Sequence, residues 1–405
     1  MVHRVFLSST FSDLSEHRTA VQNAIRQLGA SDVSMENFGA RDQRPAAECE
    51  RIIREESDLF VGIYAHRYGF IPEGSEISIC EMEYNAASAL PRFIYIVDDG
   101  HPWLPRSIDR DDAAKKLNAF KRELLNRHIC KNFTTADNLA KNVVADIGRH
   151  LVEKAIQTVQ AAPLPAPAPA PQNAAPMDLP LAQAKDQAVL VGSSVISFVS
   201  GVTAEQRRDL INSMLLAQLV AKKRVPDGAE VYDWYRAFFE VLKQIGWIVQ
   251  ALQFATQKAA VGLQTDEAIL ALATTLLGPG SSSLALVKAT LDLLKSMDAN
   301  SPWMTILNRE SQSGQTARFQ LAVAEPDDKG GLLVTLMAFA LEAHSRLTQF
   351  LFFKIHSRED VLKQVAGQIS VDAKVLAAVR DQIGEKIAEH VAAYVQILPD
   401  FDALR

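Results

Sequence analysis

Residues 57–69 read SDLFVGIYAHRYG, and the apolar run at 59–65 inside this stretch decides the fold of the first half of the chain. The run shows no alternation of polar and apolar residues, so it is too apolar for a strand with one face in water. We expect a strand buried on both faces, which is typical of a parallel sheet covered by helices. A histidine, an arginine and a tyrosine follow, which places a cation and aromatic rings at the carboxyl end of the strand.

Short apolar runs and helical patterns alternate on both sides of this strand. Apolar residues recur at helical spacing after Ser12 and Asp13, which can cap a helix that ends at Gly29. Further strands are expected at 4–8, 33–38 and 93–97, and further helices at 46–55, 76–90 and 135–159. This alternation predicts an α/β domain with a flavodoxin-like parallel sheet, whose ligands would bind beyond the carboxyl ends of the strands.

A proline-rich tract divides the chain. Residues 161–180 read AAPLPAPAPAPQNAAPMDLP and hold seven of the 17 prolines. Alternating alanine and proline favour extended polyproline II, so the tract is expected to act as a semi-rigid linker. We therefore predict an α/β domain at 1–160, a linker at 161–180 and a second, sensing or assembly domain at 181–405.

The second domain is predicted to be α+β and mostly helical, with an antiparallel meander. Long helical patterns give way to shorter apolar runs joined by turn-rich connections. Helices are expected at 204–223, 232–257, 265–277, 284–297, 358–369 and 372–397, and strands at 304–308, 317–324, 332–341 and 348–356.

Two apolar features of this domain have alternative interpretations. Aromatic residues recur at roughly helical spacing over 232–247, which favours core packing over a partner surface. Residues 332–353 are apolar on both faces, which suits a central hairpin of the sheet. The alternative is a hairpin for oligomerisation or membrane insertion.

Composition narrows the classes of function. A net charge of −6 and a pI near 5.9 disfavour non-specific nucleic-acid binding. The three cysteines are too few and too scattered for a disulfide framework or a zinc site, so no metal is expected. The first residues do not resemble a signal peptide, and no apolar run reaches the length of a membrane span. A cytoplasmic location is therefore expected, and a membrane partner is not.

Two strand ends carry candidate ligand-binding residues. Ser8, Ser9 and Thr10 form a hydroxyl-rich turn before Asp13, and this turn offers hydroxyl and backbone N–H groups to phosphate or ribose oxygens. The alternative is plain helix capping by Ser12 or Asp13. Farther along, Arg67 is a candidate partner for a phosphate or carboxylate, and Tyr68 is a candidate to stack on a base.

Glu83 is the candidate catalytic residue. Three glutamates lie near the start of the helix expected at 76–90, where the helix dipole favours negative charge. Glu83 differs from the others because it shares a helix face with Cys80, and this face continues toward the core. A carboxylate there can stabilise an oxocarbenium-like centre at a ribose C1′ or act as the nucleophile.

Four motifs in this order resemble a known family, over about a quarter of the chain. They are FLSSTFSDLSEHR at 6–18, MENF at 35–38, SDLFVGIYAHRYG at 57–69 and SICEMEYNAA at 78–87. The stretch is similar to the bacterial TIR-like domain of unknown function often found ahead of STAND-type NTPases. It departs from that family in carrying His17 before Arg18, where a glutamate is common. Residues 278–288 lack a Walker A signature, so the NTPase partner is not expected here.

The resemblance implies roles for these residues. In the wider group of TIR and nucleoside deoxyribosyltransferase-like folds, a glutamate on the helix after the third strand cleaves or exchanges an N-glycosidic bond, which nominates Glu83. Ser8, Ser9, Thr10 and Asp13 would lie in the ligand-binding loop, and Arg67 and Tyr68 in the wall of the cleft. Ser78, which opens the fourth motif, is counted with these binding residues.

The leading hypothesis is a TIR-like glycohydrolase of NAD or a related nucleotide, gated by self-assembly, in bacterial defence or toxicity. NAD would be its substrate, no metal would be needed, and the protein would form a homo-oligomer. The alternative is a non-catalytic TIR-like module that binds a nucleotide or serves as a scaffold. A third hypothesis is a toxin with a membrane-active C-terminal domain, which the absence of an amphipathic basic helix disfavours.

Overall fold

The chain divides into two compact units, here called the N-terminal unit, Val2–Leu151, and the C-terminal unit, Val152–Arg405. The computed structural model describes residues 2–35, 45–169, 180–226, 229–249, 255–257, 264–313, 316–327, 330–342 and 360–399. Among these residues, no helix combines the length and the apolar character needed to cross a bilayer.

A parallel sheet forms the centre of the N-terminal unit. In the part of the chain that the structure describes, its strand order is β2-β1-β3-β4-β5. The strands are β1 (Arg4–Ser9), β2 (Ser31–Val33), β3 (Leu59–Tyr64), β4 (Arg92–Val97) and β5 (Lys131–Phe133). Every residue of β3 is buried, as the apolar run at 59–65 predicts. The predicted α/β domain with a parallel sheet is thus confirmed.

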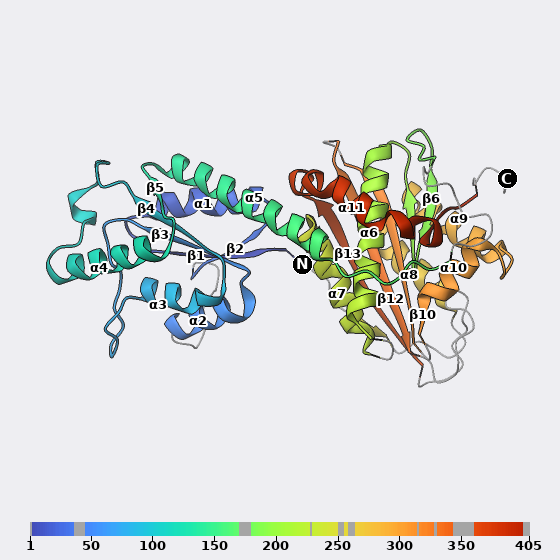
Figure 1. Cartoon of the computed structure of the whole chain (residues 1–405), viewed down its shortest axis with the longest axis horizontal. Helices are drawn as coiled ribbons and strands as arrows, with labels where there is room; N and C mark the ends of the chain where they lie inside the picture. The colour runs from blue at the N-terminus through green and yellow to red at the C-terminus, as the bar shows by residue number, and fades with distance from the viewer. Residues whose placement is uncertain are drawn as a thin grey trace. The chain divides into compact units, whose positions relative to one another are not determined.

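Helices cover both faces of this sheet. They are α1 (Ser15–Gln27), α2 (Pro45–Glu56), α3 (Ile79–Ala86), α4 (Asp111–Arg127) and α5 (Ala136–Ala161). Figure 1 shows α1 and α5 on one face of the sheet and α2, α3 and α4 on the other. On the second face, Phe6 and Phe60 of the sheet pack in one apolar core with Cys49, Tyr84 and Phe120. This layering leaves the carboxyl ends of the strands free of helices, so loops form that edge.

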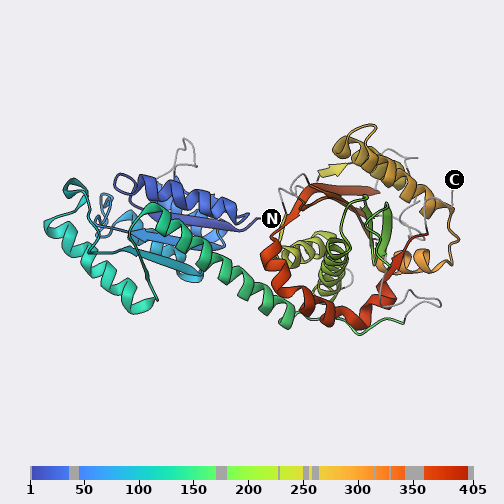
Figure 2. The same ribbon diagram turned by 90° about the horizontal axis from the view of Figure 1, so that it is seen from above.

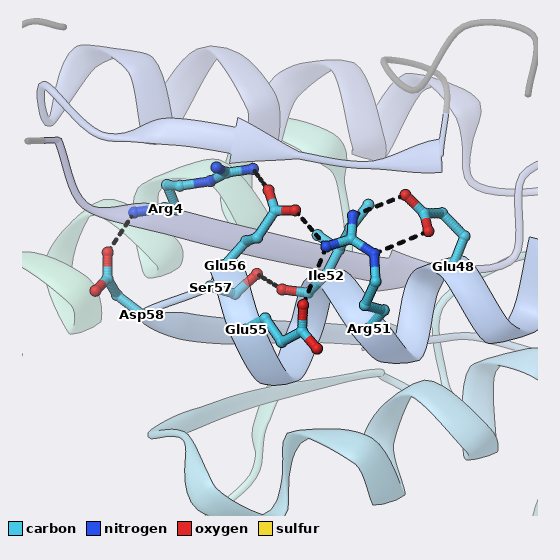
Figure 3. A network of polar contacts seen from close by, with 8 residues as sticks. All are labelled: Arg4, Glu48, Arg51, Ile52, Glu55, Glu56, Ser57 and Asp58. Carbon is cyan, nitrogen blue, oxygen red and sulfur yellow. Dashed lines mark hydrogen bonds and ion pairs between the residues drawn. The ribbon is translucent and has the colours of Figure 1, made fainter. Parts of the chain in front are cut away.

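An ionic network holds the opposite edge of the sheet (Figure 3). The guanidinium of Arg51 contacts Glu48 at 2.9 Å and Glu56 at 2.7 Å, and Glu56 also pairs with Arg4 at 2.7 Å. The backbone N–H of Arg4 donates to the carboxylate of Asp58 over 2.8 Å. The network joins the end of α2 to the starts of β1 and β3. We assign it a structural role, because it lies away from the carboxyl edge.

The C-terminal unit is built on a mixed sheet. In the described residues its order is β14-β6-β7-β11-β12-β13-β8, with β10 paired to β11 and β9 to β13. The strands are β6 (Gln187–Val191), β7 (Ser194–Phe198), β8 (Trp247–Val249), β9 (Ala255–Gln257), β10 (Gln312–Ser313), β11 (Thr316–Pro326), β12 (Leu332–Glu342), β13 (Val361–Val371) and β14 (Val395–Ile397). The pair β7 and β11 is parallel, and the other pairs are antiparallel.

Helices flank this sheet as well. They are α6 (Ala204–Arg224), α7 (Val231–Gln244), α8 (Thr265–Leu277), α9 (Ser282–Ser296), α10 (Pro302–Ser311) and α11 (Ala373–Tyr394). Figure 2 shows α6 and α7, in green, on one side of the sheet and α8 and α9, in gold, on the other. Phe319 and Phe339 face the core made with α8, α9 and α10. On the other side, the hydroxyl of Tyr235 donates to the carbonyl of Phe339 over 2.7 Å.

Burial on both faces explains the apolar stretch that begins at residue 332. Nine of the eleven residues of β12 are buried, because β11 and β13 flank the strand and helices cover the sheet. This arrangement agrees with a central strand. The rest of the predicted hairpin, including the strand expected at 348–356, lies outside the described residues.

Several predicted elements of the C-terminal unit are wrong. Residues 304–308, predicted as a strand, lie in α10, because Ser301 caps a helix by accepting a hydrogen bond from the N–H of Met304. The helix predicted at 358–369 is replaced over its described part by β13, because these residues pair with β12. The helix predicted at 232–257 ends at Gln244, where Gly246, with a φ of 103°, turns the chain into β8.

The predicted meander is only partly correct. The strands β11, β12 and β13 follow one another in antiparallel register, as a meander requires. Its first member was predicted too early, at the position of α10, and β6 and β7 join the sheet without having been predicted. The unit is therefore mostly helical with a mixed sheet.

The N-terminal unit also differs in places from the prediction. The second strand covers Ser31–Val33 instead of 33–38, and 36–38 lie outside the described residues. The helix predicted at 76–90 is the shorter α3, followed by a 3-10 turn, Ala87–Ala89. Helix α4 and strand β5 were not predicted from the sequence.

The proline-rich tract is described in part. Residues 162–169 form no helix or strand, and residues 170–179 lie outside the described residues. Within the C-terminal unit, the imidazole Nε2 of His390 lies 3.0 Å from the carbonyl oxygen of Pro165, and Lys386 donates to the carbonyl of Gln160 over 3.0 Å. The first part of the tract is thus held by side chains of α11.

Candidate functional site

The candidate site lies at the carboxyl edge of the N-terminal sheet. Because β1 and β3 are adjacent and parallel, the turn after β1 and the loop after β3 reach the same edge. The chain then enters α3, which packs against β1 and α2. The topology therefore brings together Ser8, Arg67 and Glu83 from three separate motifs.

Ser8 and Glu83 form the central contact of this region. The hydroxyl Oγ of Ser8 donates to the carboxylate Oε2 of Glu83 over 2.6 Å. Ser8 is 1% exposed and Glu83 is 4% exposed, so the contact is shielded from water. A charge-assisted hydrogen bond in such surroundings orients the carboxylate strongly.

Two thiols and a phenol surround Glu83 on the side of the core. Burial, followed by the charge of Glu83, raises the pKa of the Cys49 thiol and of the Cys80 thiol. Burial and the same carboxylate also raise the pKa of Tyr64. Tyr64 fits here because Gly62 lacks a side chain: an added Cβ would lie 2.7 Å from the tyrosine hydroxyl. These groups are therefore held in their neutral, protonated forms around the carboxylate.

The turn after β1 is held by Arg18. Its guanidinium Nη1 donates to the hydroxyl of Ser9 over 2.8 Å and to the carbonyl of Ser9 over 3.3 Å. The hydroxyl of Ser9 in turn donates to the carbonyl of Thr10 over 2.9 Å. The predicted residues Ser9 and Thr10 are thus neighbours of Ser8, but their polar groups serve in part to shape the turn.

Asp13 lies at the end of this turn. Burial raises its pKa, whereas Thr10 and the charge of Arg67 act in the opposite direction. The carboxylate is shielded from solvent and interacts with the side chain of Thr10 and with its own backbone.

Arg67 and Tyr68 are tied to neighbouring loops by Asp109. The guanidinium of Arg67 donates to the hydroxyl of Ser12 over 2.7 Å and lies 3.4 Å from the carboxylate of Asp109. The backbone N–H of Tyr68 donates to the other oxygen of Asp109 over 2.7 Å. Arg67 remains partly exposed at the edge, where an anion can reach it.

Tyr68 and Ser78 have internal partners. The ring of Tyr68 is buried, and its hydroxyl donates to Glu81 over 2.6 Å. Burial and this carboxylate raise the pKa of Tyr68 to about 12. Ser78 caps α3 by accepting a hydrogen bond from the N–H of Glu81 over 3.3 Å. Stacking of a base on Tyr68 would require this part of the edge to open.

Arg18 and Asp109 also belong to this region, although they were not predicted from the sequence. Arg18 belongs to the first motif, and its place one helical turn after Leu14 was a usable signal for a side chain that faces the sheet. No local signal identifies Asp109, because its partners lie about forty residues earlier in the chain. In the described residues, no group of three or more histidine, cysteine, aspartate or glutamate side chains could hold one metal ion.

Comparison with known proteins identifies the N-terminal unit. Residues 4–148 match a family model described as Domain of unknown function (DUF4062). These residues form a DUF4062 domain. No curated protein is similar enough in sequence to count as a relative.

Two solved structures show a distant likeness. A structure described as a delta-endotoxin is 14% identical, with a TM-score of 0.27 over 52% of this chain and 96% of its own. The structure of the Evf virulence factor is 9% identical, with a TM-score of 0.26 over 49% of this chain and 82% of its own. Neither likeness is strong enough to assign a fold or a function.

Proposed function

We propose that the N-terminal unit is a TIR-like domain that hydrolyses NAD or a related nucleotide at its N-glycosidic bond. The observation that carries this proposal is the buried pair of Ser8 and Glu83, joined over 2.6 Å at the carboxyl edge where β1 adjoins β3. In open α/β sheets this edge is where ligands bind. The four motifs that resemble the TIR-like family all belong to the same unit.

Glu83 is the proposed catalytic residue, and Ser8 positions its carboxylate. As the bond between C1′ and the nicotinamide nitrogen breaks, nicotinamide leaves with the bonding electrons. The carboxylate stabilises the positive charge that develops at C1′. Water then supplies a hydroxyl group to C1′ and releases a proton. Arg67, partly exposed at the same edge, is the proposed partner of the phosphate groups.

Self-assembly is the proposed gate. Glu83 is 4% exposed, so a substrate needs the covering residues to move before it can reach the carboxylate. Contact with a second copy of the chain would supply the free energy for this movement. The C-terminal unit is the proposed sensor or assembly element, and the setting is bacterial defence or toxicity.

The test is nicotinamide release from NAD by the purified full chain over a series of protein concentrations. Wild-type protein should release nicotinamide more than in proportion to its concentration, and Glu83→Gln should release none. Glu76→Gln is the matched control, because Glu76 is an exposed carboxylate just before the same helix. Release by Glu83→Gln at the wild-type rate would contradict the assignment.

A second function, nucleotide binding or scaffolding without catalysis, is favoured by one observation. Ser8, Tyr68 and Ser78 all form hydrogen bonds within the protein, and Glu83 is already bonded to Ser8. A binding module would gain thermal stability with NAD and form no product at any protein concentration. Product formation that depends on Glu83 would exclude it.

A further inference from the structure

The loop between β3 and α3 closes the carboxyl edge beside the helix that carries Glu83. Residues 67–77 of this loop are here called the flap. At one end of the flap, the carbonyl of His66 accepts a hydrogen bond from the N–H of Asp109 over 2.9 Å. At the other end, Ser78 caps α3. Both ends are thus fixed, so the flap can open only through movement of the residues between them.

Gly69 places the flap against the two elements that carry Ser8 and Glu83. A Cβ added at Gly69 would lie 3.3 Å from Cγ2 of Thr10 and 3.5 Å from Sγ of Cys80. Thr10 belongs to the turn after β1, and Cys80 belongs to the first turn of α3. The φ of Gly69 is 96°, a conformation that residues with a side chain rarely adopt. The flap therefore bridges the turn and the helix and covers Cys80, which is 7% exposed.

Tyr68 is the buried side chain of the flap, whereas the tip is exposed. Phe70 is 72% exposed, and residues 73 and 74 are exposed as well. The ring of Tyr68 is 3% exposed and belongs to the same apolar core as Cys80, and the half-buried Ile71 packs against this core. Removal of apolar surface from water favours the closed position only where that surface is covered. The burial that favours the closed flap therefore comes mainly from Tyr68.

Hydrogen bonds of Tyr68 hold the flap to its neighbours. Its hydroxyl donates to Oε2 of Glu81 over 2.6 Å and also interacts with Ser78, which caps the same helix. Its backbone N–H donates to the carboxylate of Asp109 over 2.7 Å. Hydrogen bonds to a charged acceptor are roughly twice as strong as those between neutral groups. The bond to Asp109 joins the flap to the loop after β4, and the bond to Glu81 joins it to the helix that carries Glu83.

We propose that the flap controls access to Glu83 and that the hydrogen bond between Tyr68 and Glu81 keeps it closed. When this bond breaks, the ring of Tyr68 leaves the core and the flap lifts from Cys80. The open edge then admits a ligand, and the freed ring of Tyr68 is available to stack on a base. Entry of a nucleotide by this route rests on the proposed function, whereas the opening itself can be measured without a ligand.

The test is prolonged labelling of thiols in the full chain without denaturant, with each cysteine followed separately by mass spectrometry. Cys80 lies under the flap, whereas Cys49 is a fully buried thiol of α2. In wild type, Cys80 should react faster than Cys49, because a local opening needs less free energy than opening of the core. Tyr68→Phe should speed the labelling of Cys80 by about tenfold or more, because the variant keeps the ring and loses the bond to a charged acceptor.

Tyr95→Phe is the matched control, because the buried Tyr95 also donates to a carboxylate, that of Asp146, over 3.1 Å. This bond joins β4 to α5 and stays intact when the flap opens, so the rate for Cys80 should equal that of wild type. An equal increase in both variants would mean that Cys80 reacts only when the whole unit unfolds, and would overturn the proposal. An unchanged rate in Tyr68→Phe would overturn it as well.

Amide hydrogen exchange separates opening of the flap from fraying of α3. The N–H of Tyr68 is released when the flap opens, whereas the N–H of Met82 donates to the carbonyl of Ser78 over 2.9 Å and is released when the helix frays. The amide of Tyr68 should therefore exchange faster than that of Met82, and equal exchange would contradict the flap. Neither measurement needs NAD, so a chain without glycohydrolase activity would still show the flap opening.

Discussion

Replacing Ser8 with alanine should destabilise the N-terminal unit through Glu83. The substitution removes the hydroxyl that donates to the carboxylate over 2.6 Å, and both residues are almost fully buried. A hydrogen bond to a charged group contributes about 1.5–3 kcal/mol to stability, and water cannot easily replace it here. We therefore expect Ser8→Ala to lower the free energy of unfolding of this unit by about 2 kcal/mol.

A double-mutant cycle separates this contact from other effects of the substitutions. The cycle compares Ser8→Ala, Glu83→Ala and the double variant with wild type. Glu83→Ala also leaves a cavity, but that cost appears on both sides of the cycle and cancels. The coupling free energy between Ser8 and Glu83 should be about 1.5–3 kcal/mol at neutral pH.

The assay can report on the N-terminal unit alone. All three cysteines belong to this unit, and Cys49 and Cys80 are buried. Labelling of their thiols at increasing urea concentration therefore follows unfolding of this unit, since the C-terminal unit has no thiol. A coupling below about 0.5 kcal/mol is within the error of additivity and would refute the claim that the pair holds the site together.

Two further predictions concern Asp13 of the N-terminal unit and the core of the C-terminal unit. Burial raises the pKa of Asp13, so the folded state binds its proton more tightly, and wild type should lose stability as pH rises from the unfolded to the raised folded pKa. Asp13→Asn should not lose stability over this pH range. The free energy of unfolding of both proteins can be measured by urea unfolding from acid to neutral pH, and an equal dependence on pH in the two proteins would contradict the reasoning. Tyr235→Phe should cost the C-terminal unit about 1–3 kcal/mol, because the carbonyl of Phe339 and the amide of Gln320 lose a buried partner. Urea unfolding followed by tryptophan fluorescence tests this, and a cost below about 0.5 kcal/mol would speak against it.

The local sequence pattern was sufficient to predict an element where its own residues determine its burial. The run at 59–65 is apolar at nearly every position, and it forms the fully buried β3. The pattern at 265–277 likewise predicted α8 with its bounds. In both cases propensity, periodicity and tertiary surroundings favour the same conformation.

Local pattern failed where strand pairing decides the conformation. Residues 361–369 carry spaced apolar side chains that fit one face of a helix, yet they form β13. The winning interaction is an antiparallel ladder with β12, which satisfies the backbone of both strands along nine residue pairs. Such a ladder depends on a distant segment, so a window of sequence cannot show it.

The candidate site, too, could be predicted from the sequence only in part. Parallel topology predicted that the turn after the first strand lies at the ligand-binding edge, but the contact between Ser8 and Glu83, which are 75 residues apart, was not predicted. The partners of Arg67 were not predictable, because they depend on how the loops after β1, β3 and β4 fold against one another. Loop conformation follows from many weak contacts and carries no periodic signal.

The sequence by itself determined that the first half of the chain is a parallel α/β domain, that a proline-rich tract follows it, and that a serine-rich turn and a glutamate-bearing helix lie at one sheet edge. These features depend on hydrophobic period, chain direction and the restricted backbone of proline, all of which are local. Only the tertiary structure decided that Ser8 binds Glu83 and that Asp109 joins Arg67 to the backbone of Tyr68. Those contacts join distant segments, and their geometry is set by packing of the whole unit.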